Sequence, residues 1–165
     1  MSNNNKFGSV GRLEDGARFV RFERRLLHSV EKVWSAITDP NELANWFPGF
    51  KAELREGGHF QIWFGEGCEG PAHVSGTVTC YEPPCVFQCG SMRYELERDG
   101  DGCLLTFTDV VQFPGSRTED ETTNSVLSGW HWFLDALEDA LAGRAVDPHK
   151  PEPDYSKIDV PGREL

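Results

Sequence analysis

The feature that most limits how this chain can fold is a long apolar stripe near its C-terminus. Between residues 120 and 141, apolar side chains recur at helical spacing, so they lie on one side of an α-helix. Gly143 follows at the position where helices commonly end. The stripe is formed by Val126, Leu127, Trp130, Phe133, Leu134, Leu137, Ala140 and Leu141. Because a helix must bury such a stripe against another layer, the rest of the chain has to supply an apolar surface.

Strands with alternating apolar residues supply this surface. In residues 59–64, for example, Phe60, Ile62 and Phe64 share one face, as the two-residue period of a strand requires. Two consecutive Asp-Gly pairs at residues 99–102 are typical of a tight hairpin turn. Consecutive hairpins of this kind indicate an antiparallel sheet. The expected strands are residues 17–27, 51–55, 59–64, 73–81, 86–89, 93–98 and 103–111.

Two short helices are expected after the first strand. Ser29 is a favourable N-cap, and apolar residues follow it at helical spacing from Val30 to Ile37. Pro40 at a first helical position indicates a second helix over residues 40–45. Together these patterns predict an α+β fold in which a curved antiparallel sheet wraps around the long C-terminal helix.

The ends of the chain differ in composition from its middle. Residues 1–16 are polar and aperiodic, which predicts disorder. Residues 17–143 form the expected domain. Residues 144–165, the C-terminal tail, are rich in proline and charge, and we expect them to be extended, docked or disordered.

Charge and cysteine content narrow the class of partner. The net charge of −11 argues against binding to nucleic acid or to an anionic membrane. The chain contains no run of about 20 apolar residues that could span a bilayer, and its first residues contain no apolar signal core. The five cysteines are odd in number and irregularly spaced, which favours reduced thiols. A leaderless cytoplasmic protein is therefore expected.

Short motifs in order between residues 18 and 143 resemble a known family. They are Glu31-Lys32-Val33-Trp34, Thr38-Asp39-Pro40, Trp46-Phe47-Pro48, Gly57-Gly58-His59-Phe60, Glu82-Pro83-Pro84 and Gly129-Trp130. Together they resemble bacterial proteins similar to the C-terminal domain of the heat-shock protein 90 ATPase activator. That family belongs to the START-like, or SRPBCC, superfamily with the helix-grip fold. The resemblance implies a cavity between sheet and long helix, which in relatives binds lipids, sterols, polyketides or other apolar molecules, and it implies no shared catalytic residue.

The expected ligand-binding residues are mostly aromatic side chains that face the long helix or belong to it. Large rings can either line such a cavity or fill it, and the sequence leaves both alternatives open. The residues are Trp46, Phe47, Phe60, Ile62, Phe64, Val78, Phe87, Phe107, Asp109, Trp130 and Phe133.

Two titratable residues are candidates for a polar role. By alternation from Phe107, Asp109 points inward, where it could bind a ligand amine or hydroxyl or act as an acid or base. The favoured interpretation is simpler: the strand has ended, and Asp109 lies in solvent or caps a turn. His28, just before the first helix, is the second candidate, and a structural role is favoured for it too.

Other motifs lack the context that their chemistry needs. Residues 65–70 match the G-x-G-x-x-G pattern, but Pro71 and a strand follow in place of the helix that binds pyrophosphate, so a flexible loop is expected. His59, His73 and Cys68 do not have the spacing of a metal site. We therefore expect no catalytic constellation, no metal and no cofactor.

Trp132 is out of place on the polar side of the long helix, near Ser128 and Asp139. An exposed tryptophan there is unfavourable, so we expect the C-terminal tail or a second copy of the chain to cover it.

The leading functional hypothesis is binding of a small apolar or amphipathic molecule in a cavity between the sheet and the C-terminal helix. One alternative is an enzyme of the polyketide cyclase or hydratase type that uses a pocket acid or base. The other is a chaperone-associated module that binds proteins through its surface.

Overall fold

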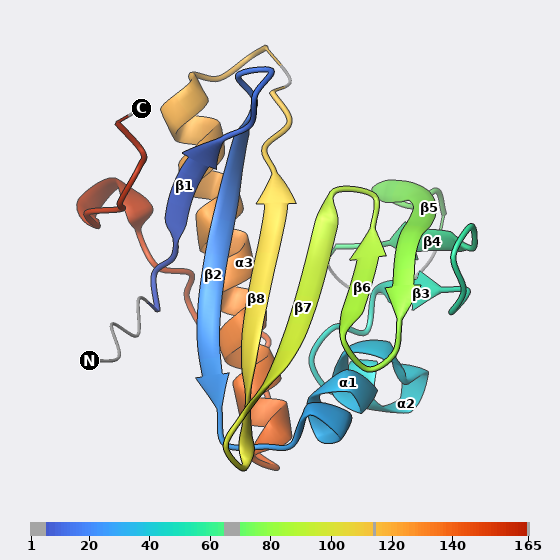
Figure 1. Cartoon of the computed structure of the whole chain (residues 1–165). Coiled ribbons are helices and arrows are strands. Elements are labelled where there is room, and N and C mark those ends of the chain that lie inside the picture. Colours follow the sequence, from blue (N-terminus) through green and yellow to red (C-terminus); the bar gives the residue numbers. More distant parts are fainter. Residues whose placement is uncertain (1–5, 65–69, 114, 165) are drawn as a thin grey trace.

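One antiparallel sheet wraps around a long C-terminal helix in the computed structural model, which describes residues 6–64, 70–113 and 115–164 (Figure 1). The order of its strands is β1-β2-β8-β7-β6-β5-β4-β3. The strands are β1 (Ser9–Arg12), β2 (Arg18–Leu26), β3 (Phe50–Ala52), β4 (His59–Ile62), β5 (Val74–Glu82), β6 (Val86–Cys89), β7 (Met92–Asp99) and β8 (Gly102–Val110). The helices are α1 (Val30–Thr38), α2 (Pro40–Leu43), α3 (Glu119–Leu141) and the short 3-10 helix η1 (Tyr155–Lys157). The predicted fold class is confirmed.

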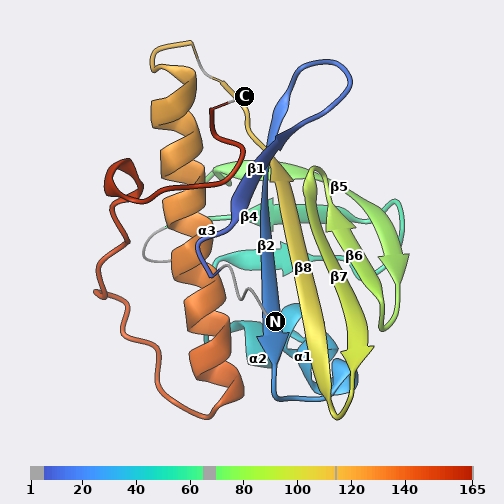
Figure 2. The same cartoon turned by 60° about the vertical axis from the view of Figure 1, so that its left-hand side comes forward.

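Helix α3 lies along one face of the sheet, next to β2 (Figure 2). It begins at a reciprocal cap: the Thr118 hydroxyl accepts from the Glu121 N–H, and the Glu121 carboxylate accepts from the Thr118 N–H. Leu127, Leu134 and Leu137 of the apolar stripe are buried. The stripe and its extent were therefore predicted correctly to within one residue.

The sheet turns sharply in the middle of β5. The pairing of β5 with β6 shifts in register between Val78 and Cys80, and such a bulge bends a strand. In Figure 1, β3 and β4 consequently run across the page, whereas β2 and β8 run vertically. Because of this bend, β4 and β3 lie at an angle to β2 and β8, so the sheet forms two walls around the helix.

Some boundaries differ from the expected ones. A strand was expected at residues 51–55, but β3 ends at Ala52 because a tight turn follows, with the Arg55 N–H bonded to the Glu53 carbonyl at 2.8 Å. Helix α2 ends at Leu43 rather than at residue 45. The side chain of Asp39 caps it by accepting from the Asn41 N–H at 2.9 Å.

The N-terminal segment differs more clearly from expectation. Residues 1–16 were expected to be disordered, yet β1 lies within them and pairs with β2. This strand is held by main-chain hydrogen bonds at a sheet edge, including one from the Val10 N–H to the Pro161 carbonyl at 2.8 Å. Because such pairing needs no apolar periodicity, the sequence pattern did not reveal it.

The C-terminal tail runs beside α3 (Figure 2). Tyr155 is buried; its hydroxyl lies 2.9 Å from His131 Nδ1 and donates to the Phe7 carbonyl at 2.8 Å. Trp132 is half-buried, and its indole N–H donates to the Lys150 carbonyl at 2.8 Å. The ammonium of Lys150 lies 4.7 Å from the centre of the Trp132 ring. The tail therefore lies against the polar side of α3.

A buried ion cluster joins β2 to α3. Arg24 is 2% exposed, and its guanidinium donates to Asp135 at 2.8 Å and to Glu138 at 2.6 Å. Burial alone would raise the pKa of Asp135, but hydrogen bonds and charge from His131 and Arg24 outweigh it and hold this pKa well below its usual range.

None of the helices in the described part of the chain combines the length and apolarity that crossing a bilayer requires.

We expect Arg24→Ala to lower the free energy of unfolding by about 3 kcal/mol, because it leaves partly buried carboxylates without their cation. Arg21→Ala is the matched control on the same strand. Its exposed ion pair with Glu23 should be worth less than about 1 kcal/mol. Urea unfolding at pH 7 measures both variants. Equal losses would show that the buried pairs do not hold β2 on α3.

Candidate ligand-binding site

A cavity of about 520 Å³ lies between the bent part of the sheet and helix α3. Its walls come from β4, β5, the turn before β7, the end of β8 and the first half of α3. The lining residues are Phe60, Ile62, Phe64, Val74, Ser75, Gly76, Cys89, Gly90, Ser91, Met92, Asp109, Val110, Gln112, Ser125, Val126, Gly129, Trp130 and Phe133.

Aromatic rings form the floor of this cavity. Trp130 packs on Phe107 with 4.5 Å between ring centres and lies 5.8 Å from Phe133. Phe60 fits against β5 because Gly76 has no side chain: a Cβ there would lie 2.9 Å from the Phe60 ring. The sheet can therefore carry a large ring at this point and still leave space in front of it.

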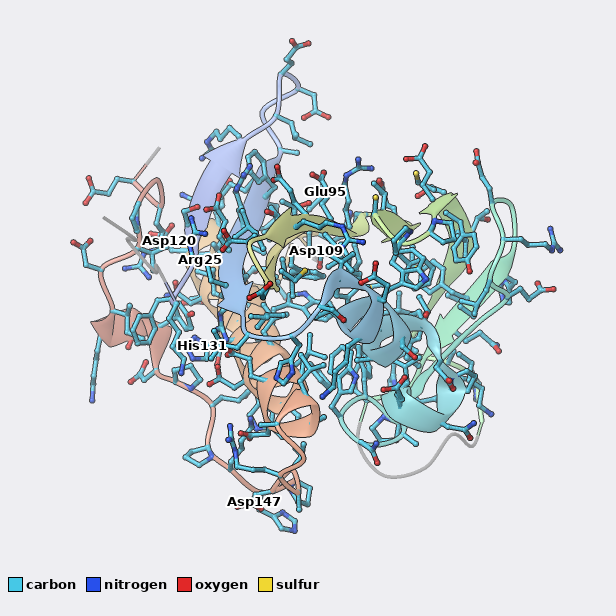
Figure 3. All side chains as sticks on the ribbon, turned by 60° about the horizontal axis from the view of Figure 1, so that its bottom comes forward. Arg25, Glu95, Asp109, Asp120, His131 and Asp147 are labelled. Carbon is cyan, nitrogen blue, oxygen red and sulfur yellow. The ribbon has the colours of Figure 1, made fainter. Side chains whose placement is uncertain are left out.

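Asp109 is the one charged side chain among the described lining residues, which are otherwise apolar or neutral and polar. It lies near the centre of the molecule in the view of Figure 3. Its Oδ1 accepts from the Ser91 hydroxyl at 2.7 Å, and its Oδ2 accepts from the Trp130 indole N–H at 3.0 Å. Among the described residues, no cation lies within ion-pair distance of it. The carboxylate is thus oriented by neutral donors, which leaves its charge unmatched.

Burial raises the pKa of the Asp109 carboxyl above its ordinary value, and the hydrogen bonds from Ser91 and Trp130 offset part of that effect. Burial also raises the pKa of the Cys89 thiol, which lines the same cavity, to about 12. The thiol is therefore neutral at pH 7. Asp109 is the one carboxyl among the described residues that line this cavity.

The favoured interpretation of Asp109 from sequence, a wet or turn-capping residue, is wrong. Strand β8 continues to Val110, so Asp109 keeps the inward orientation that alternation from Phe107 gives it. His28 is not among the described residues that line this cavity. It follows β2, whose end pairs with Cys103, so it lies at the opposite end of the β2–β8 pair from Asp109. Its pKa is lowered by burial and by nearby Lys32.

The structure brings together part of the expected ligand-binding set. The residues that line the cavity are Phe60, Ile62, Phe64, Asp109, Trp130 and Phe133. Trp46 and Phe47 line a second cavity on the other side of Phe133. Val78, Phe87 and Phe107 are fully buried in the core behind the walls. These three share the correct face of the sheet, but side chains fill the space at their level.

Several lining residues were not predicted, chiefly small or polar ones. Ser91 lies in the turn between β6 and β7, where no periodicity applies. Gly129 occurs in one of the sequence motifs and Gly76 lies inside β5, but neither position by itself shows that the residue borders a cavity. A glycine inside a strand or a helix is the signal that could have identified them, because it marks a place where another group approaches closely.

The remaining sequence candidates form no site in the described residues. His73 accepts from the Phe64 N–H at 3.0 Å through Nδ1. In residues 6–64, 70–113 and 115–164, no three His, Cys, Asp or Glu side chains group in a way that could hold a metal ion. Cys68 and all but the last glycine of the G-x-G-x-x-G loop, residues 65–69, lie outside the described residues.

Comparison with known proteins identifies a family. The model of the family described as activator of Hsp90 ATPase homolog 1-like protein matches residues 27–142. CalU16 from Micromonospora echinospora is 28% identical, with a TM-score of 0.60, over 82% of this chain and 83% of CalU16. No curated protein has a matching sequence.

Two further solved structures have a similar fold. DynU16, a protein of the dynemicin biosynthetic locus, is 25% identical, with a TM-score of 0.60. The match covers 78% of this chain and 49% of DynU16, so this chain spans about half of DynU16. EF2215 from Enterococcus faecalis, a protein of unknown function, is 21% identical, with a TM-score of 0.61, over 96% of this chain and 90% of EF2215. At that identity the likeness shows the fold alone.

We expect NMR titration of the Asp109 carboxyl carbon to give a pKa above the ordinary aspartate value of about 3.9. Ser91→Ala should raise it further, because the lost hydrogen bond favours the charged form. The folded state holds this proton more tightly than the unfolded state. The free energy of unfolding should therefore fall as pH rises from the pKa of Asp109 in the unfolded chain to its higher pKa in the folded protein. Ser75→Ala, on the same cavity wall, is the control. A lower pKa in Ser91→Ala would contradict this account of the carboxylate.

Proposed function

The chain belongs to the family of activator of Hsp90 ATPase homolog 1-like proteins, and from this premise we propose that it binds a small amphipathic molecule between its sheet and α3. The cavity of about 520 Å³ carries this proposal. Small-molecule sites typically measure roughly 300–1,000 Å³ and combine apolar walls with a few polar groups. This cavity has both properties, and its fold and family are consistent with ligand binding.

Asp109 defines the polar end of the ligand. Its carboxylate already accepts one neutral hydrogen bond on each oxygen, and each oxygen has a further lone pair. A group that donates a hydrogen bond and also carries positive charge would match both the geometry and the uncompensated charge. The ligand therefore has an apolar body and an amine, or failing that a hydroxyl, which lies at Asp109.

The likeness to DynU16 supports a small-molecule ligand, because that protein comes from a biosynthetic locus. CalU16 supports the same domain architecture at higher coverage of its own length. Neither comparison names a ligand for this chain.

A second candidate function rests on the same carboxyl. A desolvated acid with a raised pKa, at hydrogen-bond distance from two oriented donors, has the properties of a general acid or base. An enzyme of the polyketide cyclase or hydratase type would use it to remove or deliver a proton. Binding is the leading function because Asp109 is the one carboxyl in the described cavity wall, so no second acid or base stands beside it.

The amine preference is testable with a matched pair of probes, naphthylmethylamine and naphthylmethanol. Asp109→Asn should weaken binding of the amine by about tenfold to a hundredfold, because a charge-assisted hydrogen bond is lost. The alcohol should change by less than about threefold, since the amide oxygen still accepts. Isothermal titration calorimetry measures both, with Asp101→Asn as an exposed control. Equal losses for both probes would contradict the amine assignment.

The location of the site is testable by filling the cavity. Val126 lines it from α3 and is only half-buried, so Val126→Trp places a ring in empty space. We expect naphthylmethylamine binding to fall more than tenfold, while the free energy of unfolding changes by less than about 3 kcal/mol. Leu54→Trp, in the exposed turn after β3, should change neither quantity. A Val126→Trp protein that binds the probe normally would place the site elsewhere.

The enzyme alternative predicts proton exchange at carbon. In deuterium oxide, a carboxylate base would take a proton from the central carbon of a β-diketone and return a deuteron to it. NMR would then show faster exchange with the native protein than with Asp109→Asn. Equal rates for the two proteins would leave binding as the function of this cavity.

A further inference from the structure

A second cavity, of about 420 Å³, lies on the far side of Phe133 from the first. Its walls come from the segment between α2 and β3, the two residues after β4, the middle of α3 and the C-terminal tail. The lining residues are Ala44, Asn45, Trp46, Phe47, Pro48, Gly49, Trp63, Phe64, Trp132, Phe133, Val146, Pro148 and His149. The tail thus completes a hollow that the domain alone leaves open.

Two phenylalanines separate the cavities. Phe133 and Phe64 line both of them, and their ring centres lie 6.4 Å apart. Phe133 is also stacked on Phe47, with 4.3 Å between ring centres. Phe47, which lines the second cavity, thus supports the Phe133 ring that separates the two cavities.

Three tryptophan rings dominate the walls of the second cavity, and Asn45 and His149 add polar side chains to them. The indole N–H of Trp46 donates to the Ala36 carbonyl at 2.9 Å, that of Trp63 to Gly70 at 3.1 Å, and that of Trp132 to Lys150 at 2.8 Å. All three donors are used within the protein. A molecule in this cavity is therefore contacted by aromatic faces and edges, which favour a planar aromatic ring.

Two ammonium groups lie beside tryptophan rings of this cavity, whereas a carboxylate lines the first cavity. No Asp or Glu is among its described lining residues. The ammonium of Lys150 lies 4.7 Å from the Trp132 ring centre, and that of Lys51 lies 5.5 Å from the Trp63 ring centre. Lys150 is 4.0 Å from Asp139, which offsets part of its charge; among the described residues Lys51 has no such partner. Both ammonium groups lie behind ring walls rather than among the lining residues, and the Asp147 carboxylate, which accepts from the His149 N–H at 2.9 Å, belongs to the same stretch of the tail.

We infer that the second cavity is a binding site for a planar aromatic anion of the aromatic carboxylate class. The ring would lie among the three tryptophans and Phe133, with its carboxylate directed toward Lys51 and Lys150. This inference is independent of the proposed function, because it concerns different walls, opposite charge and a different ligand class.

The test is naphthoate added to isotopically labelled protein, observed through the indole N–H signals in a heteronuclear NMR spectrum. The five tryptophans report separate places: three line the second cavity, Trp130 lines the first, and Trp34 lines neither. Naphthoate should shift the signals of Trp46, Trp63 and Trp132 and leave Trp130 and Trp34 in place. Naphthylmethylamine should shift Trp130. Shifts confined to Trp130, or no shifts with naphthoate, would overturn the inference.

The charge assignment has its own variants. Lys51→Gln combined with Lys150→Gln should weaken naphthoate binding by about fivefold, the loss expected for one exposed and one partly buried charge. Lys157→Gln, an exposed lysine elsewhere in the tail, should leave the affinity within about twofold. Added salt should weaken binding to the native protein and have less effect on the double variant. Unchanged affinity in the double variant would overturn the role of the lysines.

Separate variants should abolish ligand binding in each of the two cavities. Asp109→Asn should leave naphthoate binding unchanged, and Ala44→Trp, at the exposed rim of the second cavity, should abolish it while sparing naphthylmethylamine. If Ala44→Trp weakens both probes equally, the two cavities act as one site and the inference falls.

Discussion

A sheet that curves cannot contact a straight helix along its whole width, and the rest of this structure depends on that constraint. Helix α3 packs directly against β2, where Arg24 joins the two elements by buried ion pairs. The bulge in β5 then bends the sheet, so that β4 and β3 run at an angle to β2 and β8. The cavity lies where contact has been lost, between β4, β5 and the first half of the helix. Tight packing at one edge and empty space at the other have the same geometric cause.

The fold followed from periodicity, because burial imposes it on nearly every element. The stripe from Val126 to Leu141 and the alternation in β4 and β8 each reflect a single buried face. The sequence pattern did not predict strand β1, because main-chain hydrogen bonds hold it at the sheet edge with little buried apolar surface. Periodicity reveals which side chains are buried and says little about segments that the backbone alone secures.

The site was only partly predictable, for a related reason. Alternation identifies the face of a strand, so it placed Phe60, Phe107 and Asp109 on the inner side. It does not show how far along the strand the packed core ends and the cavity begins. Phe107 is packed in the core, whereas Asp109, two residues later on the same face, lines the cavity. The point where the core ends depends on where the sheet bends. That bend arises from a register shift between Val78 and Cys80, for which the sequence has no marker.

The Tyr155 hydroxyl lies beside His131 and donates to the Phe7 carbonyl, so it joins the two ends of the chain on one side of α3. The Val10–Pro161 hydrogen bond nearby does the same. During synthesis on the ribosome, β1 can pair with β2 as soon as that strand follows it, but the hydrogen bond from Val10 to Pro161 needs a residue translated some 150 positions later. The outer edge of β1 is therefore completed only when the tail has been made.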